Sequence, residues 1–164
     1  ILFGKNETFI SKLRKSKKGQ QTYLGSLMFS SKFKDILFEE EFGMIDFDWV
    51  LKLFHNQNSI ELCKPLYIRN ISLDNLSLNE KYRKIDYNYS LSTINNYMAN
   101  YSKDVRLSQR RINGSMGRYY YLIGNMSYAR KYFLKSSFNI KTLLYIITTF
   151  AGSRLVKRYF NIFG

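Results

Sequence analysis

The chain has 164 residues and a formal net charge of +14, with 45% hydrophobic and 17% aromatic residues. This hydrophobic content can support a core and excludes an intrinsically disordered chain, and the length fits one domain or a partial domain with an appendage. The single cysteine, Cys63, excludes a disulfide framework within the chain. It falls in a predicted strand, which indicates a small buried apolar residue rather than a nucleophile.

Two strands are predicted in the first half of the chain. Residues 21–33 are β-branched, aromatic and small with loose alternation, which is typical of a strand followed by a short helix or turn. Residues 60–70 form the second predicted strand, and Pro65 within it lacks an N–H and indicates an edge strand or a strand start. A polar loop follows, up to Ser77. The basic stretch before the first strand, residues 11–19, is interpreted as a solvated loop, with a substrate-side loop over phosphates as the alternative.

An acid-headed helix is predicted between the two strands. Asp46 and Asp48 open an amphipathic segment in which Trp49 and Leu53 can face a core. Negative charge in the first turn of a helix is favoured by the macrodipole, so the simplest interpretation is two helix-start acids, one of them an N-cap. His55 falls at the end of this helix, and we interpret it as a capping residue rather than a catalyst.

This order of elements resembles the acceptor-side half of a family-2 glycosyltransferase. The resemblance covers about residues 20–80 and rests on a series of short motifs: Gly25-Ser26-Leu27-Met28-Phe29, Phe38 to Glu40, Gly43, Asp46 with Asp48, Pro65-Leu66-Tyr67 with Arg69, and Ser77. The family's tail motif has its match at Gly124, Asn125, Ala129, Arg130, Tyr132 and Phe133. Ile45 departs from the family, which usually has Glu there, and Asn70 or Ile71 stands where many members have His.

The resemblance implies an α/β fold: the C-terminal half of a GT-A-like nucleotide-sugar transferase domain, followed by an α-helical tail. Residues 1–100 would be the acceptor-side part, and residues 101–164 a basic helical C-terminal tail. Residues 1–36 contain no glycine-rich phosphate loop and no Asp-x-Asp motif. The expectation is therefore that the donor-binding half is missing, and that this fragment alone is inactive.

The resemblance also implies roles for individual residues. Asp46 would be the general base, taking the proton of the acceptor hydroxyl as that oxygen attacks the anomeric carbon. Asp48 would either have a structural role or orient the acceptor, and Trp49 would face either the core or the acceptor cleft. Arg69 and Ser77 would contact the donor phosphates or the acceptor.

The expected partners are a nucleotide-sugar donor and a glycan or lipid-linked acceptor. A divalent metal, Mg or Mn, is expected in the intact enzyme to neutralise the leaving diphosphate. Its ligands would lie mostly outside this chain, because the family's metal motif ends an earlier strand, whereas Asp46 and Asp48 head a helix. The expected location is cytoplasmic, with peripheral attachment to the inner face of the plasma membrane as a further expectation.

A break in composition falls near Asn100. Residues 1–100 contain 14 Lys and Arg and 11 Asp and Glu, a net charge of +3, whereas residues 101–164 contain 12 Lys and Arg and one acid, a net charge of +11. Periodicity predicts three helices in the basic part, over residues 104–123, 126–137 and 140–161. Gly124 and Asn125 are typical of a helix stop between the first two.

The alternative function is a non-catalytic basic helical module that binds a membrane surface, a partner protein or nucleic acid. The apolar run of the last predicted helix is far shorter than the ~20 residues that span a bilayer, and cations such as Lys141 flank it, as in interfacial helices. A small helical bundle with a solvated charged face explains the same pattern. Arginines interleaved with tyrosines at residues 106–121 suit nucleic acid, but no recognised binding motif accompanies them. Nucleic acid is the least favoured partner.

Overall fold

The computed structural model describes residues 1–16, 19–40, 46–64, 68 and 79–152, and the structural statements below refer to these. Of the described residues 60% are helical and 3% lie in strands. The strands are β1 (Leu2–Phe3) and β2 (Ser59–Ile60), which pair antiparallel with Leu2 opposite Ile60. The predicted α/β fold, half of a GT-A-like domain, is therefore wrong, because the described residues form a mainly helical structure around one short two-stranded sheet.

The first predicted strand is replaced by irregular chain. Residues 21–33 contain two short 3-10 helices, η1 (Leu24–Ser26) and η2 (Ser31–Phe33). Phe29 of this region packs on Trp49 instead of a partner strand, meeting the indole edge-on at 5.3 Å between ring centres, and Phe38, which follows the region, stacks on the indole at 4.7 Å. An aromatic segment can pack against a helix as well as against a strand, so its pattern does not distinguish the two.

The second predicted strand, residues 60–70, is also mostly absent from the described residues. Only Ile60 lies in β2, residues 61–64 are outside any strand, and Pro65 lies outside the part of the chain that is described. Cys63 is exposed, so the interpretation of this thiol as a buried apolar residue is wrong. A short β2 leaves the thiol on a segment that no second strand covers.

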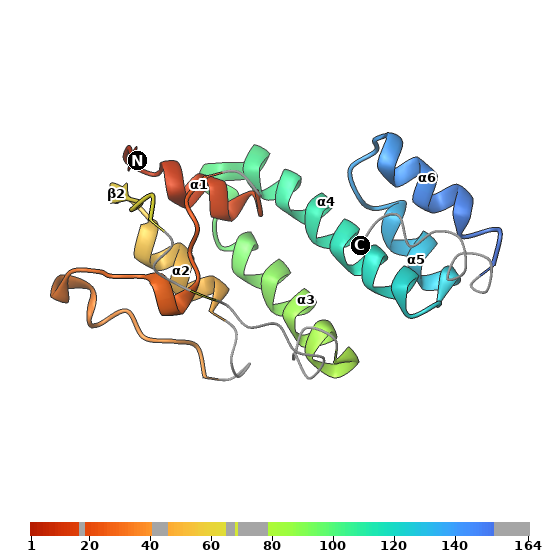
Figure 1. Cartoon of the computed structure of the whole chain (residues 1–164), viewed down its shortest axis with the longest axis horizontal. Coiled ribbons are helices and arrows are strands. Elements are labelled where there is room, and N and C mark those ends of the chain that lie inside the picture. Colours follow the sequence, from red (N-terminus) through yellow and green to blue (C-terminus); the bar gives the residue numbers. More distant parts are fainter. Residues whose placement is uncertain (17–18, 41–45, 65–67, 69–78, 153–164) are drawn as a thin grey trace. The chain divides into compact units, whose positions relative to one another are not determined.

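The chain divides into two compact units, unit 1 (Ile1–Val105) and unit 2 (Arg106–Gly164). The division falls within α4 (Met98–Leu122), whose backbone leaves helical angles at Tyr101, with φ −132° and ψ 39°. Figure 1 shows the elements of both units in sequence colours. The composition break predicted near Asn100 lies close to this division in the sequence.

Unit 1 is built on three further helices, α1 (Glu7–Leu13), α2 (Phe47–Phe54) and α3 (Glu80–Asn95). α1 packs on α2, and α2 packs on α3. Helix α2 begins at its N-cap Asp46 and ends at its C-cap His55, as the sequence predicts. The core of unit 1 is formed mainly by apolar side chains of these helices: Phe9, Leu13, Trp49, Val50, Leu51, Leu53, Phe54, Tyr89, Ile94 and Val105.

Unit 2 contains the second part of α4 and two shorter helices, α5 (Met126–Phe133) and α6 (Ile140–Thr148). Asparagine caps both: Asn125 accepts a hydrogen bond from the Tyr128 amide, and Asn139 accepts one from the Thr142 amide. Figure 1 shows α5 and α6 as neighbouring helices. The three helices predicted from periodicity are thus present with different ends, since α4 begins before residue 104, and α5 and α6 end before residues 137 and 161.

The core of unit 2 is largely aromatic. Tyr145 of α6 stacks on Phe133 of α5 at 4.9 Å and meets Tyr121 of α4 edge-on at the same distance between ring centres. The ring of Phe133 lies against Gly117, where an added Cβ would come within 2.8 Å of the ring. Close approach of α5 to α4 therefore depends on a glycine. Within the described residues, no helix combines the length and the apolarity that crossing a bilayer requires.

Candidate functional site

Asp46 is a partly buried acid at a helix start that makes no side-chain capping hydrogen bond. It is the N-cap of α2. Burial raises the pKa of the Asp46 carboxyl, its own backbone amide and Lys15 oppose this rise, and Asp86 adds to it. A carboxylate with a raised pKa accepts a proton more readily at neutral pH, which is the property that general bases require.

Lys15 reaches this region through a strained end of α1. Its amide donates to the Lys12 carbonyl at 2.8 Å, and the next amide, of Ser16, donates to the Ser11 carbonyl at 2.9 Å. Helices that end with this pair of hydrogen bonds usually place glycine where Lys15 stands, because the position needs a left-handed backbone. Lys15 has a φ of 50°, and a lysine in this conformation costs roughly 1–2 kcal/mol. Strain of this kind is typical of functional positions.

The Lys15 ammonium points into unit 1. Its Nζ lies 3.5 Å from the centre of the Phe47 ring and donates a hydrogen bond to Ser90 Oγ at 3.1 Å. Burial lowers the pKa of Lys15, while the charges of Asp86 and then Asp46 oppose the change. The ammonium therefore lies against an aromatic face and a hydroxyl, and it interacts electrostatically with two carboxylates and with Arg83.

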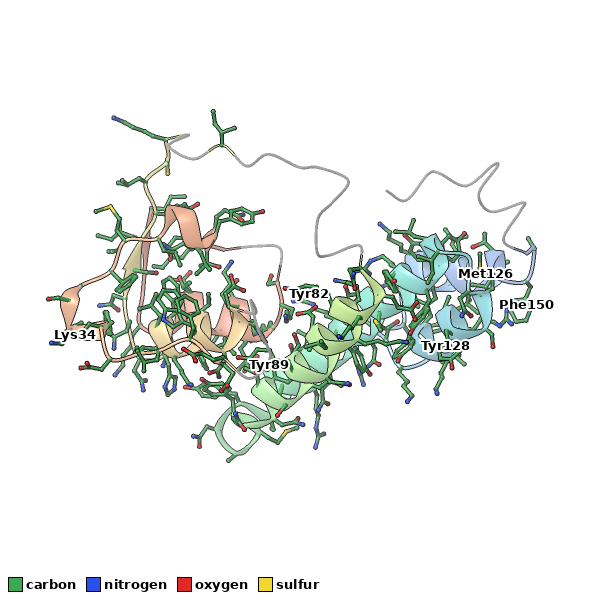
Figure 2. All side chains as sticks on the ribbon, turned by 90° about the horizontal axis from the view of Figure 1, so that it is seen from below. Lys34, Tyr82, Tyr89, Met126, Tyr128 and Phe150 are labelled. Carbon is green, nitrogen blue, oxygen red and sulfur yellow. The ribbon has the colours of Figure 1, made fainter. Side chains whose placement is uncertain are left out.

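One face of α3 completes this arrangement. Arg83, Asp86 and Ser90 follow each other at i, i+3 and i+7, a spacing that aligns side chains on a helix. Asp86 accepts a hydrogen bond from the Ser90 hydroxyl at 3.4 Å, and its other oxygen lies 3.8 Å from Arg83 Nη1. Figure 2 labels two tyrosines of the same helix, Tyr82 and Tyr89. Burial raises the pKa of Tyr82, and Asp86 and Asp46 raise it further.

We call these side chains the charge cluster, and its members are Lys15, Asp46, Arg83, Asp86 and Ser90. They come from the end of α1, the start of α2 and one face of α3. Its four ionisable groups carry two positive and two negative formal charges, so the cluster is balanced when all are ionised. Protonation of Asp46 leaves one carboxylate, Asp86, against the two cations Lys15 and Arg83, so it gives the cluster a net positive charge.

Asp48 and Trp49, the expected acceptor contacts, lie in the core of unit 1. Asp48 is buried and pairs with Lys52, at 2.5 Å between Oδ2 and Nζ. The Trp49 side chain is 4% exposed and donates its indole N–H to the Ile36 carbonyl at 2.8 Å. Of the two positions considered for Trp49, the structure gives the core. Arg69 and Ser77 lie outside the described residues.

Asp46 and Asp48 do not fit a divalent cation. Lys15 interacts electrostatically with Asp46, and Lys52 pairs with Asp48, so a cation at these carboxylates would meet two ammonium groups. In the described ranges, no three side chains of His, Cys, Asp or Glu gather as metal ligands.

The sequence points to Asp46 but not to its neighbours. The spacing of Arg83, Asp86 and Ser90 is a detectable signal of one helical face, although the polar composition of α3 conceals the helix itself. Lys15 gives no such signal, since it is one cation in the basic stretch that was interpreted as solvated. Only the fold shows that its ammonium turns inward.

Comparison of the chain with family models, with curated proteins and with solved structures finds no match. The functional argument therefore depends on the short motifs of the sequence and on the geometry around Asp46.

Proposed function

We propose that this chain carries the acceptor-side general base of an inverting glycosyltransferase, which moves a sugar from a nucleotide-diphosphate donor to a hydroxyl of a glycan or lipid-linked acceptor. The observation that carries the proposal is the half-buried carboxylate of Asp46, whose pKa is raised by burial. The family-2 motifs of residues 20–80 surround it in the sequence. The proposal does not include a GT-A-like α/β fold, which the described residues lack.

In the proposed reaction, the acceptor hydroxyl attacks the anomeric carbon of the donor sugar. A bond forms between the acceptor oxygen and that carbon, while the bond from the carbon to the diphosphate oxygen breaks with its electron pair. The nucleoside diphosphate leaves, and attack from the opposite side inverts the configuration. Asp46 takes the proton of the acceptor hydroxyl, because this hydroxyl becomes acidic as its oxygen forms the new bond.

The rest of the charge cluster would set the basicity of Asp46. Lys15 favours the ionised carboxylate, which is the form that can accept a proton, whereas Asp86 and burial favour the protonated form. Because Ser90 and Asp86 hold the Lys15 side chain in place, these opposing effects have a fixed geometry. Lys15 and Asp86 are thus proposed as positioning residues, and Asp46 as the catalytic residue.

The proposal is tested by nucleoside-diphosphate release from a panel of UDP- and GDP-sugars, with a membrane glycolipid extract as acceptor. The protein is expressed from its natural reading frame. We expect Asp46→Asn to lower turnover about 10²- to 10⁴-fold, the usual contribution of a general base, while donor binding survives. Asp35→Asn is the matched control, since Asp35 is an exposed acid outside the charge cluster and should keep wild-type turnover.

Two results would overturn the proposal. Equal turnover of Asp46→Asn and wild type would make Asp46 a helix N-cap only. Absence of acceptor-dependent release with every donor would leave the alternative, a non-catalytic basic helical module. Unit 2 favours that alternative by its composition, because residues 106–164 contain 11 Lys and Arg and no acid.

A further inference from the structure

In helix α6 the polar face is buried and the apolar face is exposed, which is the reverse of an ordinary surface helix. Thr142, Tyr145 and Thr149 are buried against unit 2. Apart from Lys141, the exposed side chains of α6 are apolar, and together with Phe150 just after the helix they follow helical spacing: Ile140, Leu143, Leu144, Ile147 and Phe150. Ile140 is 80% exposed and Phe150 is 73% exposed. Surface helices normally bury the apolar stripe and expose the polar one, so this stripe marks an interaction surface.

Specific contacts fix α6 in this orientation. The Thr142 hydroxyl donates to the Ser137 carbonyl at 2.9 Å, and the Tyr121 hydroxyl donates to Thr148 Oγ1 at 2.9 Å. The Arg130 guanidinium donates to the Thr149 carbonyl at 3.0 Å. These hydrogen bonds satisfy the polar face inside unit 2, so rotation of the apolar stripe into the core would leave buried polar groups without partners.

The apolar surface continues beyond α6. Leu134 and Phe138, in the segment from α5 to α6, are 74% and 82% exposed. Figure 2 labels Phe150 at the other end, just after α6. We call this set the apolar stripe, and its members are Leu134, Phe138, Ile140, Leu143, Leu144, Ile147 and Phe150. Three exposed cations accompany it in the sequence: Lys131, Lys135 and Lys141.

We propose that the apolar stripe docks on the surface of an anionic lipid bilayer, with α6 lying in the plane of the headgroups. The aliphatic side chains would enter the acyl boundary, and the lysines would attract anionic headgroups. The charge of unit 2 complements such a surface, since residues 106–164 have a net charge of +11 without one acid. With 9 residues, α6 is about 13 Å long, less than half of the ~30 Å that a spanning helix must cover.

Lipid suits this surface better than nucleic acid. A nucleic acid gives phosphates for the cations and bases for stacking on aromatic rings, but it offers no partner for the five exposed Ile and Leu side chains of the apolar stripe. An acyl boundary takes up aliphatic and aromatic side chains alike. The occupant is therefore expected to need both an apolar layer and negative charge.

The test is flotation of the whole chain with vesicles of phosphatidylcholine alone or of phosphatidylcholine with about 30% phosphatidylglycerol. The salt concentration is physiological, about 0.15 M. We expect binding to the anionic vesicles only. Leu143→Ser with Ile147→Ser should weaken it at least tenfold by removing apolar contacts. The matched control replaces two exposed leucines of unit 1, Leu37→Ser with Leu62→Ser, and should bind like the wild type.

A second variant tests the role of charge. Replacing Lys131, Lys135 and Lys141 by Gln should weaken binding to anionic vesicles roughly a hundredfold, at about fivefold for each cation. Far-UV circular dichroism checks that each variant keeps its helix content. Two independent sets of variants keep the test decisive if one of them fails to fold.

Several outcomes would overturn the proposal. Binding to neutral and anionic vesicles alike would remove the role of charge, and absence of vesicle binding would exclude the lipid surface. If the wild type and the serine variant bound a single-stranded oligonucleotide equally well, unit 2 would be assigned to nucleic-acid binding. Without vesicles, a change in molecular mass between the wild type and the serine variant would show that the stripe forms a dimer interface. A change in the protease cleavage pattern would show that another part of the chain covers the stripe. None of these results depends on Asp46, so the proposed catalysis stands or falls separately.

Discussion

The two units of this chain treat charge and apolar surface in opposite ways. Unit 1 turns charged groups inward: the Lys15 ammonium lies against Phe47 and Ser90, and Asp46 is half-buried at the start of α2. Among the described residues of unit 2, Lys131, Lys135 and Lys141 are exposed and α6 exposes apolar side chains, while hydroxyls and tyrosine rings face the core of the unit.

Each arrangement costs stability, and the two costs indicate different uses. A buried ammonium or carboxylate is desolvated, and this penalty is recovered only in part by its partners. Such groups are commonly kept where their altered pKa serves chemistry. An exposed apolar stripe is unfavourable in water and is commonly kept where it binds. The comparison therefore separates a region suited to proton transfer from a region suited to docking.

The largest expected effect concerns the support of the charge cluster in unit 1. Trp49→Ala removes the ring on which Phe29 and Phe38 pack, together with the hydrogen bond to the Ile36 carbonyl. We expect a loss of about 3–5 kcal/mol in the free energy of unfolding, as for other buried aromatic residues. Urea denaturation followed by far-UV circular dichroism measures it.

Trp49→Phe is the control for this variant. It keeps an aromatic ring between the same neighbours but leaves the Ile36 carbonyl without its indole donor, so a smaller loss of about 1–3 kcal/mol is expected. If both variants were as stable as the wild type, the irregular segment would not be held by Trp49, and the inward packing of unit 1 would need another explanation.

A smaller effect tests the close packing of unit 2. Gly117→Ala would place a Cβ 2.8 Å from the Phe133 ring, whereas at Gly114 the nearest atom to an added Cβ is 3.4 Å away. Both changes gain up to about 1 kcal/mol in helix propensity. At residue 117 the strain of about 1–3 kcal/mol exceeds that gain, so thermal unfolding should shift to a lower temperature. Gly114→Ala should be neutral or stabilising, and the same shift in both variants would contradict the packing of α5 on α4.

The sequence predicts the helices of the basic part and the acid-headed helix well. In α2, Asp46 and His55 occupy the predicted ends, because the start and stop signals there agree with the apolar periodicity. In unit 2, Gly124 has a φ of 87° and stops α4, as its position beside Asn125 predicts. Local signals suffice where one helix face is clearly apolar.

Predictions that depend on distant contacts fail. Residues 21–33 have strand-like composition, but their aromatic neighbours find Trp49 rather than a second strand. The polar helix α3 has no apolar period strong enough to reveal it, and yet it supplies three of the five members of the charge cluster. Lys15 and Asp86 are 71 residues apart, and only folding brings them together. The resemblance to a glycosyltransferase gave the wrong fold class, and the role that it implies for Asp46 stays a prediction.

The subtlest test concerns how pH acts on the buried charges of unit 1. Because the folded state raises the pKa of Asp46, the folded protein holds a proton there that the unfolded chain releases, so stability should fall as pH rises from below 3.8 through the raised folded value. Asp46→Asn removes this fall. Urea denaturation across that range should show similar stability of wild type and variant at low pH and an increasing advantage of the variant toward neutral pH, with Asp35→Asn correcting for the loss of one formal charge. Lys15→Met sharpens the comparison, since loss of the opposing ammonium raises the pKa of Asp46 further and should extend the fall to higher pH. A pH profile that Lys15→Met leaves unchanged would mean that Lys15 and Asp46 do not interact, and the charge cluster would then be two separate features of unit 1.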